Sequence, residues 1–151
     1  MASIIPGPKP YSITLHIYQK DPNFGSFSIV EQTVWYNANG GTWSEASGAL
    51  TLNMGGSGTS GVIRFKSTKG QLITVAVGVD NNKRWCDIVT GLKPDQTALK
   101  INGEYYNNGP RSYMREKHLA EYTVKSSAGT TYKINYTVRE GEKLAADIII
   151  G

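Results

Sequence analysis

A glycine-rich stretch at residues 55–61, GGSGTSG, has the clearest capacity for close contact with a ligand. Four of its seven residues are glycine, which frees the backbone and leaves main-chain N–H and C=O groups unshielded by side chains. Such a stretch serves as a long hairpin turn, or as a loop that recognises a phosphate, a nucleic acid or a sugar. The other residues of the chain are needed to distinguish between these uses.

The stretch does not fit a phosphate-binding loop. Residues 56–61 have the glycine spacing of a P-loop, but Val62 stands where that motif has lysine, and a strand-like segment follows instead of a helix. No βαβ pattern surrounds the glycines, so the dinucleotide-binding fingerprint is absent as well.

The chain offers no catalytic or metal-binding cluster. His16 and His118 lie far apart in sequence, whereas metal sites favour clustered ligands. Cys86 lies in a segment that resembles a packed strand, where a free cysteine acts as a small apolar residue. We therefore expect no enzyme activity, no metal and no organic cofactor.

Nucleic-acid binding has some support in the composition. The net charge is +4, and aromatic and basic residues occur close together in two places. These are Lys83, Arg84 and Trp85, and then Tyr105, Tyr106 and Arg111. The other Lys and Arg residues are scattered, as on an ordinary solvated surface.

A sugar fits the composition better. Hydroxyl groups of a pyranose pair with planar polar side chains and backbone amides, while its C–H faces pack on aromatic rings. The candidate polar residues are Asp80, Asn81, Asn82, Asp87, Thr90 and Arg111, with several of the nine tyrosines. Surface Asp and Asn are also common turn residues, so composition alone does not settle the ligand.

The elements that must position these residues are mostly strands. Apolar and polar residues alternate from Tyr11 to Tyr18, and further strand-like segments are separated by turn residues. The expected strands lie at 27–36, 49–54, 62–66, 71–79, 131–138 and 144–150, with a turn at 37–41 and a terminal hairpin at 140–142. A short helix is expected at 94–100, and residues 115–122 are ambiguous. Many short, antiparallel-looking strands predict a β-sandwich.

Length and composition are typical of one globular domain of 151 residues. We expect residues 1–10, with Pro6, Pro8 and Pro10, to form a flexible or extended arm, and residues 11–151 to form the domain. The single cysteine excludes an intrachain disulfide, and residues 1–10 lack the features of a signal peptide. We therefore expect a cytoplasmic location.

Several segments in order resemble the fungal fruit-body lectin family. They are residues 39–46 (NGGTWSEA), 54–61 (MGGSGTSG), 83–90 (KRWCDIVT), 115–117 (REK), 136–138 (YTV) and 140–141 (EG). The resemblance covers about residues 11–151 and implies a mainly β fold: an actinoporin-like β-sandwich of two sheets joined by a short helix–loop–helix connection. It implies carbohydrate binding without catalysis, glycans and glycoproteins as partners, assembly as a homodimer or homotetramer, and a role in defence.

The resemblance also implies two sugar sites in each protomer. One takes galactose-β1,3-N-acetylgalactosamine (the T-antigen disaccharide) and is called here the galactose-type site; it would use Ala38, Ser57, Gly58, Asp80 and Asn81. The other takes terminal N-acetylglucosamine and is called the GlcNAc-type site; it would use Asp87, Ile88, Thr90, Arg111 and Tyr122. In the first, the Ser57 hydroxyl and the Gly58 amide would meet sugar hydroxyls. In the second, Asp87 would accept, Arg111 would donate, and Ile88 or Tyr122 would cover apolar faces. The family has a strand around Tyr122, so we expect one at the end of 115–122.

The chain departs from the family at two positions of the galactose-type site. The family usually has a histidine where this chain has Asp80 and a tyrosine where it has Asn82. A neutral imidazole can donate a hydrogen bond, whereas an ionised carboxylate only accepts. We therefore hypothesise that the galactose-type site is altered in strength or preference and that the GlcNAc-type site is intact.

The shared fold raises a membrane pore former as an alternative function. Such proteins insert an N-terminal amphipathic helix, which Pro6, Pro8 and Pro10 disfavour here. A nucleic-acid-binding module is the other alternative.

Overall fold

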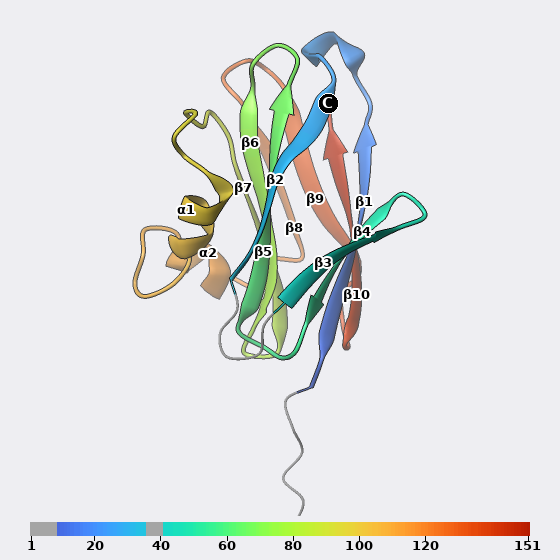
Figure 1. The fold of residues 1–151 in the computed structure, drawn as a ribbon, viewed down its shortest axis with the longest axis vertical. Helices are drawn as coiled ribbons and strands as arrows, with labels where there is room; N and C mark the ends of the chain where they lie inside the picture. Colours follow the sequence, from blue (N-terminus) through green and yellow to red (C-terminus); the bar gives the residue numbers. More distant parts are fainter. Residues whose placement is uncertain (1–8, 36–40) are drawn as a thin grey trace, which may run out of the picture.

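Two β-sheets face each other across a buried apolar layer in the computed structural model, which describes residues 9–35 and 41–151 (Figure 1). The six-stranded sheet has the order β3 (Gly41–Ala46), β4 (Ala49–Met54), β1 (Tyr11–Gln19), β10 (Lys143–Ile150), β9 (Thr131–Val138) and β8 (Glu121–Lys125). The four-stranded sheet has the order β2 (Phe27–Trp35), β5 (Thr59–Ser67), β6 (Leu72–Asp80) and β7 (Lys83–Val89). The expected β-sandwich is confirmed.

The alternation predicted for the first strand is confirmed in β1. Tyr11, Ile13 and Leu15 are buried between the sheets, while Ser12 and Thr14 are half-buried on the other face. The direction of pairing was not foreseen, because β1 pairs parallel with β10 while antiparallel strands were expected. No tight hairpin joins the two strands, so the connection leaves their relative direction free.

Most other expected strands are present, with two differences. The strand at 49–54 and the terminal hairpin of β9 and β10 are found as predicted. Residues 41–46 form β3, although the turn predicted at 37–41 includes the first of them. The last three residues of the glycine-rich stretch belong to β5, which begins at Thr59. The loop between β4 and β5 is therefore shorter than the sequence indicated. Residues 1–8 of the expected arm, and most of the expected turn at 37–41, lie outside the described residues.

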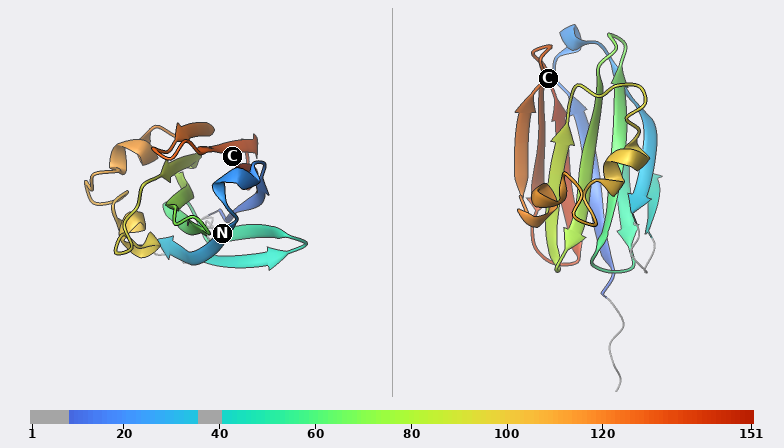
Figure 2. Two further views of the ribbon diagram at one scale, coloured as in Figure 1. Left: turned by 90° about the horizontal axis from the view of Figure 1, so that it is seen from above. Right: turned by 90° about the vertical axis from the view of Figure 1, so that its left-hand side faces the viewer.

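Two short helices connect the sheets, as the family resemblance implied. Along the chain, helix α1 (Ala98–Gly103) and helix α2 (Ser112–Glu116) come between β7 of one sheet and β8 of the other. In space, they pack against the outer face of the four-stranded sheet (Figure 2). Helix α1 begins later than predicted, because the Thr97 hydroxyl caps it by accepting from the Lys100 amide at 3.2 Å. Residues 115–122 divide between the end of α2 and the start of β8, so the strand expected around Tyr122 is confirmed.

The hairpin between β6 and β7 turns at Asn81 and Asn82. Both have positive φ, 49° and 62°, as a two-residue type I′ hairpin turn requires. Asparagine tolerates this conformation better than most side chains. The tight turn fixes Asp80 and Lys83 as neighbours across its base.

Gly61 serves packing rather than loop flexibility. It lies inside β5, and a Cβ atom there would stand only 2.4 Å from Cζ2 of Trp43. The Trp43 indole of β3 reaches across to the other sheet and donates from Nε1 to the Thr33 carbonyl at 2.9 Å. The Trp43 ring can therefore lie against the four-stranded sheet only because residue 61 has no side chain.

We predict that Gly61→Ala destabilises the fold by about 1–3 kcal/mol, the usual cost of overpacking a well-filled site. Chemical denaturation measures this free energy. Gly103→Ala is the matched control, because its Cβ would meet only Trp35 Cζ3 at an ordinary 3.6 Å. Equal stability of the Gly61 variant and the parent would show that Trp43 does not depend on this contact.

Candidate functional site

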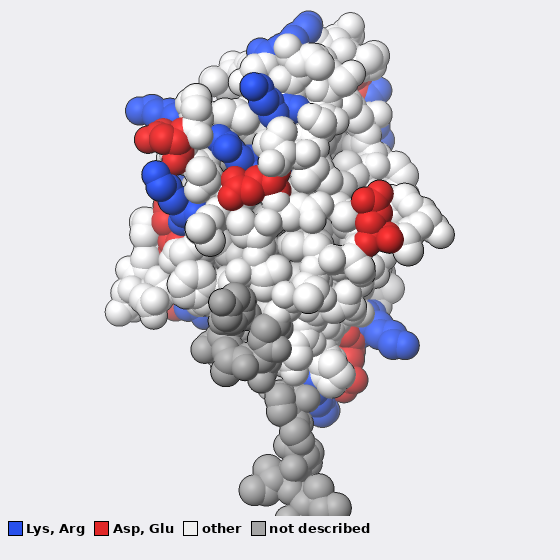
Figure 3. All heavy atoms as spheres, viewed as in Figure 1, with Lys and Arg blue, Asp and Glu red and all other residues white. Residues whose placement is uncertain are grey.

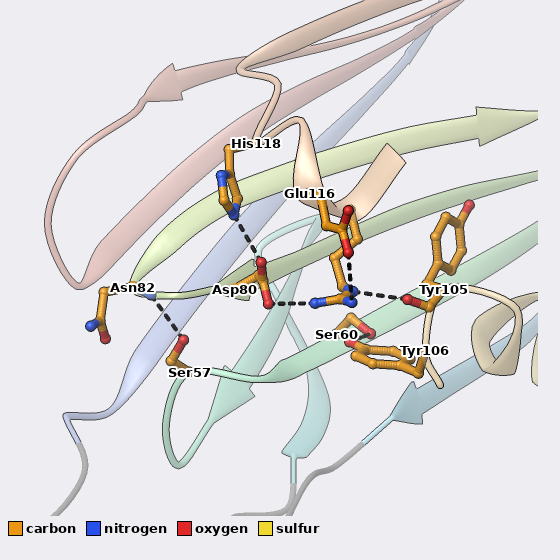
Figure 4. Close-up of polar contacts among 9 residues, drawn as sticks. Ser57, Ser60, Asp80, Asn82, Tyr105, Tyr106, Glu116 and His118 are labelled. Atoms are coloured by element: carbon orange, nitrogen blue, oxygen red, sulfur yellow. Dashed lines mark hydrogen bonds and ion pairs between the residues drawn. The ribbon is translucent and has the colours of Figure 1, made fainter. Parts of the chain in front are cut away.

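The residues expected at the galactose-type site come from two neighbouring turns. Ser57 and Gly58 lie in the loop between β4 and β5, while Asp80 and Asn81 lie at the hairpin turn between β6 and β7. The two turns are joined by a hydrogen bond from the Asn82 amide to Ser57 Oγ at 3.0 Å (Figure 4). Ala38, the fifth residue, lies outside the described residues.

The role expected for the Gly58 amide is wrong. This amide donates to the Val79 carbonyl at 2.8 Å, which closes the loop against the end of β6 and leaves no proton for a sugar. Gly58 has φ of 91°, a backbone conformation that residues with a side chain rarely adopt. Ser57 Oγ accepts from the Asn82 amide but still has its own hydroxyl proton to donate.

Asp80 is engaged by the protein itself. Its Oδ1 accepts from Arg115 Nη1 at 2.6 Å, and its Oδ2 lies 2.9 Å from His118 Nε2 (Figure 4). Its side chain is only 13% exposed. Asp80 therefore holds the end of α2 against the β6–β7 turn, and little of the carboxylate is left for a sugar.

Arg115 continues this network into an aromatic stack. Its Nε donates to the Tyr105 carbonyl at 2.8 Å, and its guanidinium lies 5.1 Å from the centre of the Tyr106 ring. Tyr106 stacks on Trp35 with ring centres 4.8 Å apart, and its hydroxyl lies 2.6 Å from Ser60 Oγ. Burial raises the pKa of Tyr106 to about 12, so the hydroxyl stays protonated at neutral pH.

Sequence reasoning assigned no site role to Arg115, set His118 aside as a metal ligand, and named Tyr106 only among the residues that could support nucleic-acid binding. Their partners lie 35 to 46 residues away in the chain, as for Arg115 with Asp80 and Tyr106 with Ser60. The only available signal was the REK segment at 115–117, which marked the family resemblance without indicating a contact.

Three of the GlcNAc-type residues, Asp87, Arg111 and Tyr122, come from segments at the seam between β7 and β8, where the edges of the two sheets lie together beside α2. Asp87 lies in the middle of β7, Arg111 directly precedes α2, and Tyr122 lies in β8. Burial raises the pKa of Asp87, and the Arg111 charge is one of the causes that oppose this shift; burial, and then the Asp87 charge, raise the pKa of Tyr122. Three separate segments thus lie within electrostatic reach of one carboxylate.

Asp87 is a buried carboxylate that is only partly compensated. It is 3% exposed, and its Oδ2 accepts from the Tyr105 hydroxyl at 2.8 Å. Burial raises the pKa of Asp87, while the Tyr105 hydrogen bond and the Arg111 charge oppose the shift. Burial and the neighbouring Asp87 charge raise the pKa of Tyr105 well above its ordinary value, so Tyr105 remains a donor.

Ile88 does not have the role suggested for its side chain. It is 4% exposed and packs in the apolar layer between the two sheets, on the opposite side of β7 from Asp87. Its side chain therefore cannot cover the face of a sugar. Tyr122 is half-buried and contacts the apolar layer between the sheets as well as a second group of buried apolar residues under the helices, which includes Trp85 and Tyr105. Thr90 lies half-buried just after β7 ends.

Cys86 also packs in this layer, as its sequence context predicted. Burial raises the pKa of its thiol to about 12, so almost no nucleophilic thiolate forms at neutral pH. His16 is exposed on β1. Within residues 9–35 and 41–151, no three His, Cys, Asp or Glu side chains gather as a metal site, and no helix is both long and apolar enough to span a membrane.

Charges of both signs mix on the face shown in Figure 3, with wide uncharged areas between them. The described side chains on this face form no continuous basic strip of the kind that tracks a nucleic-acid backbone.

We predict that Asp87→Asn raises thermal stability at neutral pH. Because folding raises the pKa of Asp87, ionisation opposes folding, and this penalty develops as pH rises above 3.8 and is complete above the raised pKa. Asparagine removes the charge and keeps an acceptor for Tyr105. Calorimetry at pH 7 and at pH 3 should show a higher Tm for the variant only at pH 7, by about 2–4 °C for each kcal/mol gained. The exposed Asp95→Asn is the control, and an equal or lower Tm of the Asp87 variant at pH 7 would contradict the prediction.

Comparison with known proteins places this geometry in a family. The family model described as fungal fruit body lectin matches residues 9–148. The Boletus edulis lectin is 67% identical over 139 residues, which span 92% of this chain and 97% of that protein. Two solved structures of the Xerocomus chrysenteron lectin are each 66% identical to this chain. A mutated form has a TM-score of 0.95 over 96% of this chain and all of that one. The wild-type structure has a TM-score of 0.93, and the match covers 94% of this chain and 99% of that one. The chain therefore belongs to the fungal fruit body lectin family.

Proposed function

We propose that this carbohydrate-binding lectin has two sugar sites in each protomer and carries out no catalysis. The GlcNAc-type site takes terminal N-acetylglucosamine, and the galactose-type site takes galactose-β1,3-N-acetylgalactosamine or related glycans. The proposal combines the family membership with the positions of the side chains described above.

The observation that carries the proposal is the convergence of Asp87, Arg111 and Tyr122 at the seam between β7 and β8. A carboxylate, a guanidinium and a phenol from three segments lie within electrostatic reach of one another, with Asp87 itself 3% exposed and Arg111 paired with Glu104 at 3.3 Å. This is the set of groups that a pyranose requires. Thr90 adds a hydroxyl just after β7 ends.

At the galactose-type site, the freely available groups are the Ser57 hydroxyl and the Asn81 side chain. Asn81 is exposed at the tip of the hairpin, where its amide can donate and accept together. Asp80 acts through its contacts, because Arg115 and His118 occupy its oxygens. We therefore retain the hypothesis that this site differs in strength or preference from that of relatives with histidine there.

Affinity for a single sugar is weak, because water competes for each hydroxyl group. A homodimer or homotetramer would present several sites together and gain avidity for glycoproteins on a cell surface. We further propose a cytoplasmic location and a defence role, as the family resemblance suggests.

The two-site proposal predicts separable losses. Asn81→Gly keeps the positive φ of the turn and removes only the side chain, so binding of the galactose-type disaccharide should fall about tenfold. Arg111→Ala should weaken N-acetylglucosamine binding by a similar factor. Each variant should leave the other sugar unaffected on a glycan array.

Asn108→Gly is the matched control, because Asn108 has φ of 59° in the loop between the helices, far in sequence from the hairpin. It should bind both sugars as the parent does. Loss of both sugars in either site variant would contradict the idea of two independent sites.

The role of Asp80 has its own test. Asp80→His removes the acceptor of Arg115 and His118, so stability should fall by about 1.5–3 kcal/mol, as for a lost hydrogen bond to a charged group. Affinity for the galactose-type disaccharide should change at a temperature where the variant remains folded. Unchanged affinity in isothermal titration would show that Asp80 does not set the preference of the site.

A further inference from the structure

A pocket of about 350 Å³ opens beside the hairpin turn of β6 and β7, outside both sets of predicted sugar residues. Three segments form it: the hairpin turn, the segment that follows α2, and the turn between β9 and β10. Its volume is at the lower end of the range for ligand pockets, about 300–1,000 Å³. It is therefore large enough for one small ligand.

The pocket gathers much of the positive charge of the molecule. Its lining includes four cationic side chains, Lys83, Arg84, Lys117 and Arg139, and only one carboxylate, Glu140. The chain as a whole has 16 Lys and Arg residues against 12 Asp and Glu, so the excess of cations over carboxylates is much larger in this lining than on average. The lining predicts an anionic ligand.

The acidic residues nearby leave most of this charge uncompensated. Asp80 is occupied by Arg115 and His118, and Glu121 approaches only Arg139, at 3.5 Å. Among the described residues, no carboxylate lies within ion-pair distance of Lys83 or Lys117, and the buried Nε of Arg84 has no acceptor. A bound anion would supply the missing partner.

The kind of donor indicates the kind of anion. The two guanidinium groups already donate to the protein, Arg84 to the His118 carbonyl and Arg139 to Tyr136 and Asn135. The remaining donors, Lys83 and Lys117, are point charges from different segments, and the Lys117 ammonium also lies 5.3 Å from the centre of the Tyr113 ring. Two ammonium groups from different segments can each pair with a different oxygen of a tetrahedral sulfate or phosphate, and lysine commonly binds phosphate as a point charge.

The pocket adjoins the galactose-type site. Asn82 lines the pocket and also donates from its amide to Ser57 of that site. We propose that the pocket binds a sugar residue carrying a tetrahedral oxyanion, a sulfate or phosphate ester. Anion binding follows from the pocket itself, while the identification of a sugar as its carrier rests on the proposed lectin function.

The test compares four sugars that share one ring and differ at C6: galactose 6-sulfate, galactose 6-phosphate, galacturonic acid and galactose. Titrations followed by amide chemical shifts, at constant pH and ionic strength, should show the two esters binding at residues 82–84 and 117–118. Both should bind at least tenfold more tightly than galactose and galacturonic acid. Their affinity should fall as salt is raised.

The informative variant is Lys83→Gln with Lys117→Gln. Its matched control is Lys100→Gln with Lys125→Gln, which removes the same charge from exposed positions outside the pocket. Affinity for the esters should fall about tenfold in the pocket variant and stay at the parental value in the control. A preference for the sulfate over the phosphate, or the reverse, identifies which ester the pocket takes.

Several results would overturn the proposal. They are equal binding of all four sugars, equal losses in both double variants, and tighter binding of a single-stranded oligonucleotide, which would indicate a nucleic-acid site instead. Failure of the lectin function is distinguished by inorganic sulfate. If sulfate shifts the pocket amides while no neutral glycan binds on an array, the anion site stands and the sugar assignment falls.

Discussion

The ion pair of Asp80 with Arg115 ties the short helix α2 to the hairpin turn between β6 and β7. Asp80 ends β6, and Arg115 lies near the end of the short helix α2, whose five residues cannot be stable alone. The pair fixes the helix against the hairpin turn, and the Arg115 guanidinium then rests on the Tyr106–Trp35 stack. The galactose-type site and the basic pocket both lie on this hairpin, so the same carboxylate helps to position both of them.

A different compromise is found at the seam between β7 and β8. Asp87 is a charged group in a strand whose neighbouring residues, Cys86 and Ile88, face the apolar layer between the sheets. The Tyr105 hydroxyl and the Arg111 charge offset only part of its desolvation. The carboxylate accepts from the Tyr105 hydroxyl, and it belongs to the GlcNAc-type site that we propose. A bound sugar hydroxyl would add a hydrogen bond that the free protein lacks.

Local patterns predicted the strands well, because each alternating segment has one face against the apolar layer. They did not predict β3, because its sequence GTWSEA has no clear alternation of apolar and polar residues. The position of the Trp43 ring depends on Gly61 of the other sheet, which leaves space for it. At the site, residue types indicated a sugar, and the resemblance supplied the positions. The Gly58 amide, the Ile88 side chain and the partners of Asp80 depended on contacts across the fold, which no spacing along the chain encodes.

The parallel pairing of β1 with β10 affects how the molecule can form. Most strand pairs here are hairpins between neighbours in the chain, and these can assemble locally. The centre of the six-stranded sheet instead joins the first strand to the tenth, so β1 has a free edge until everything between them has been made. During synthesis on the ribosome, the four-stranded sheet can close early, whereas the other must wait. The unpaired edge of β1 is then a place where nascent chains could pair with one another.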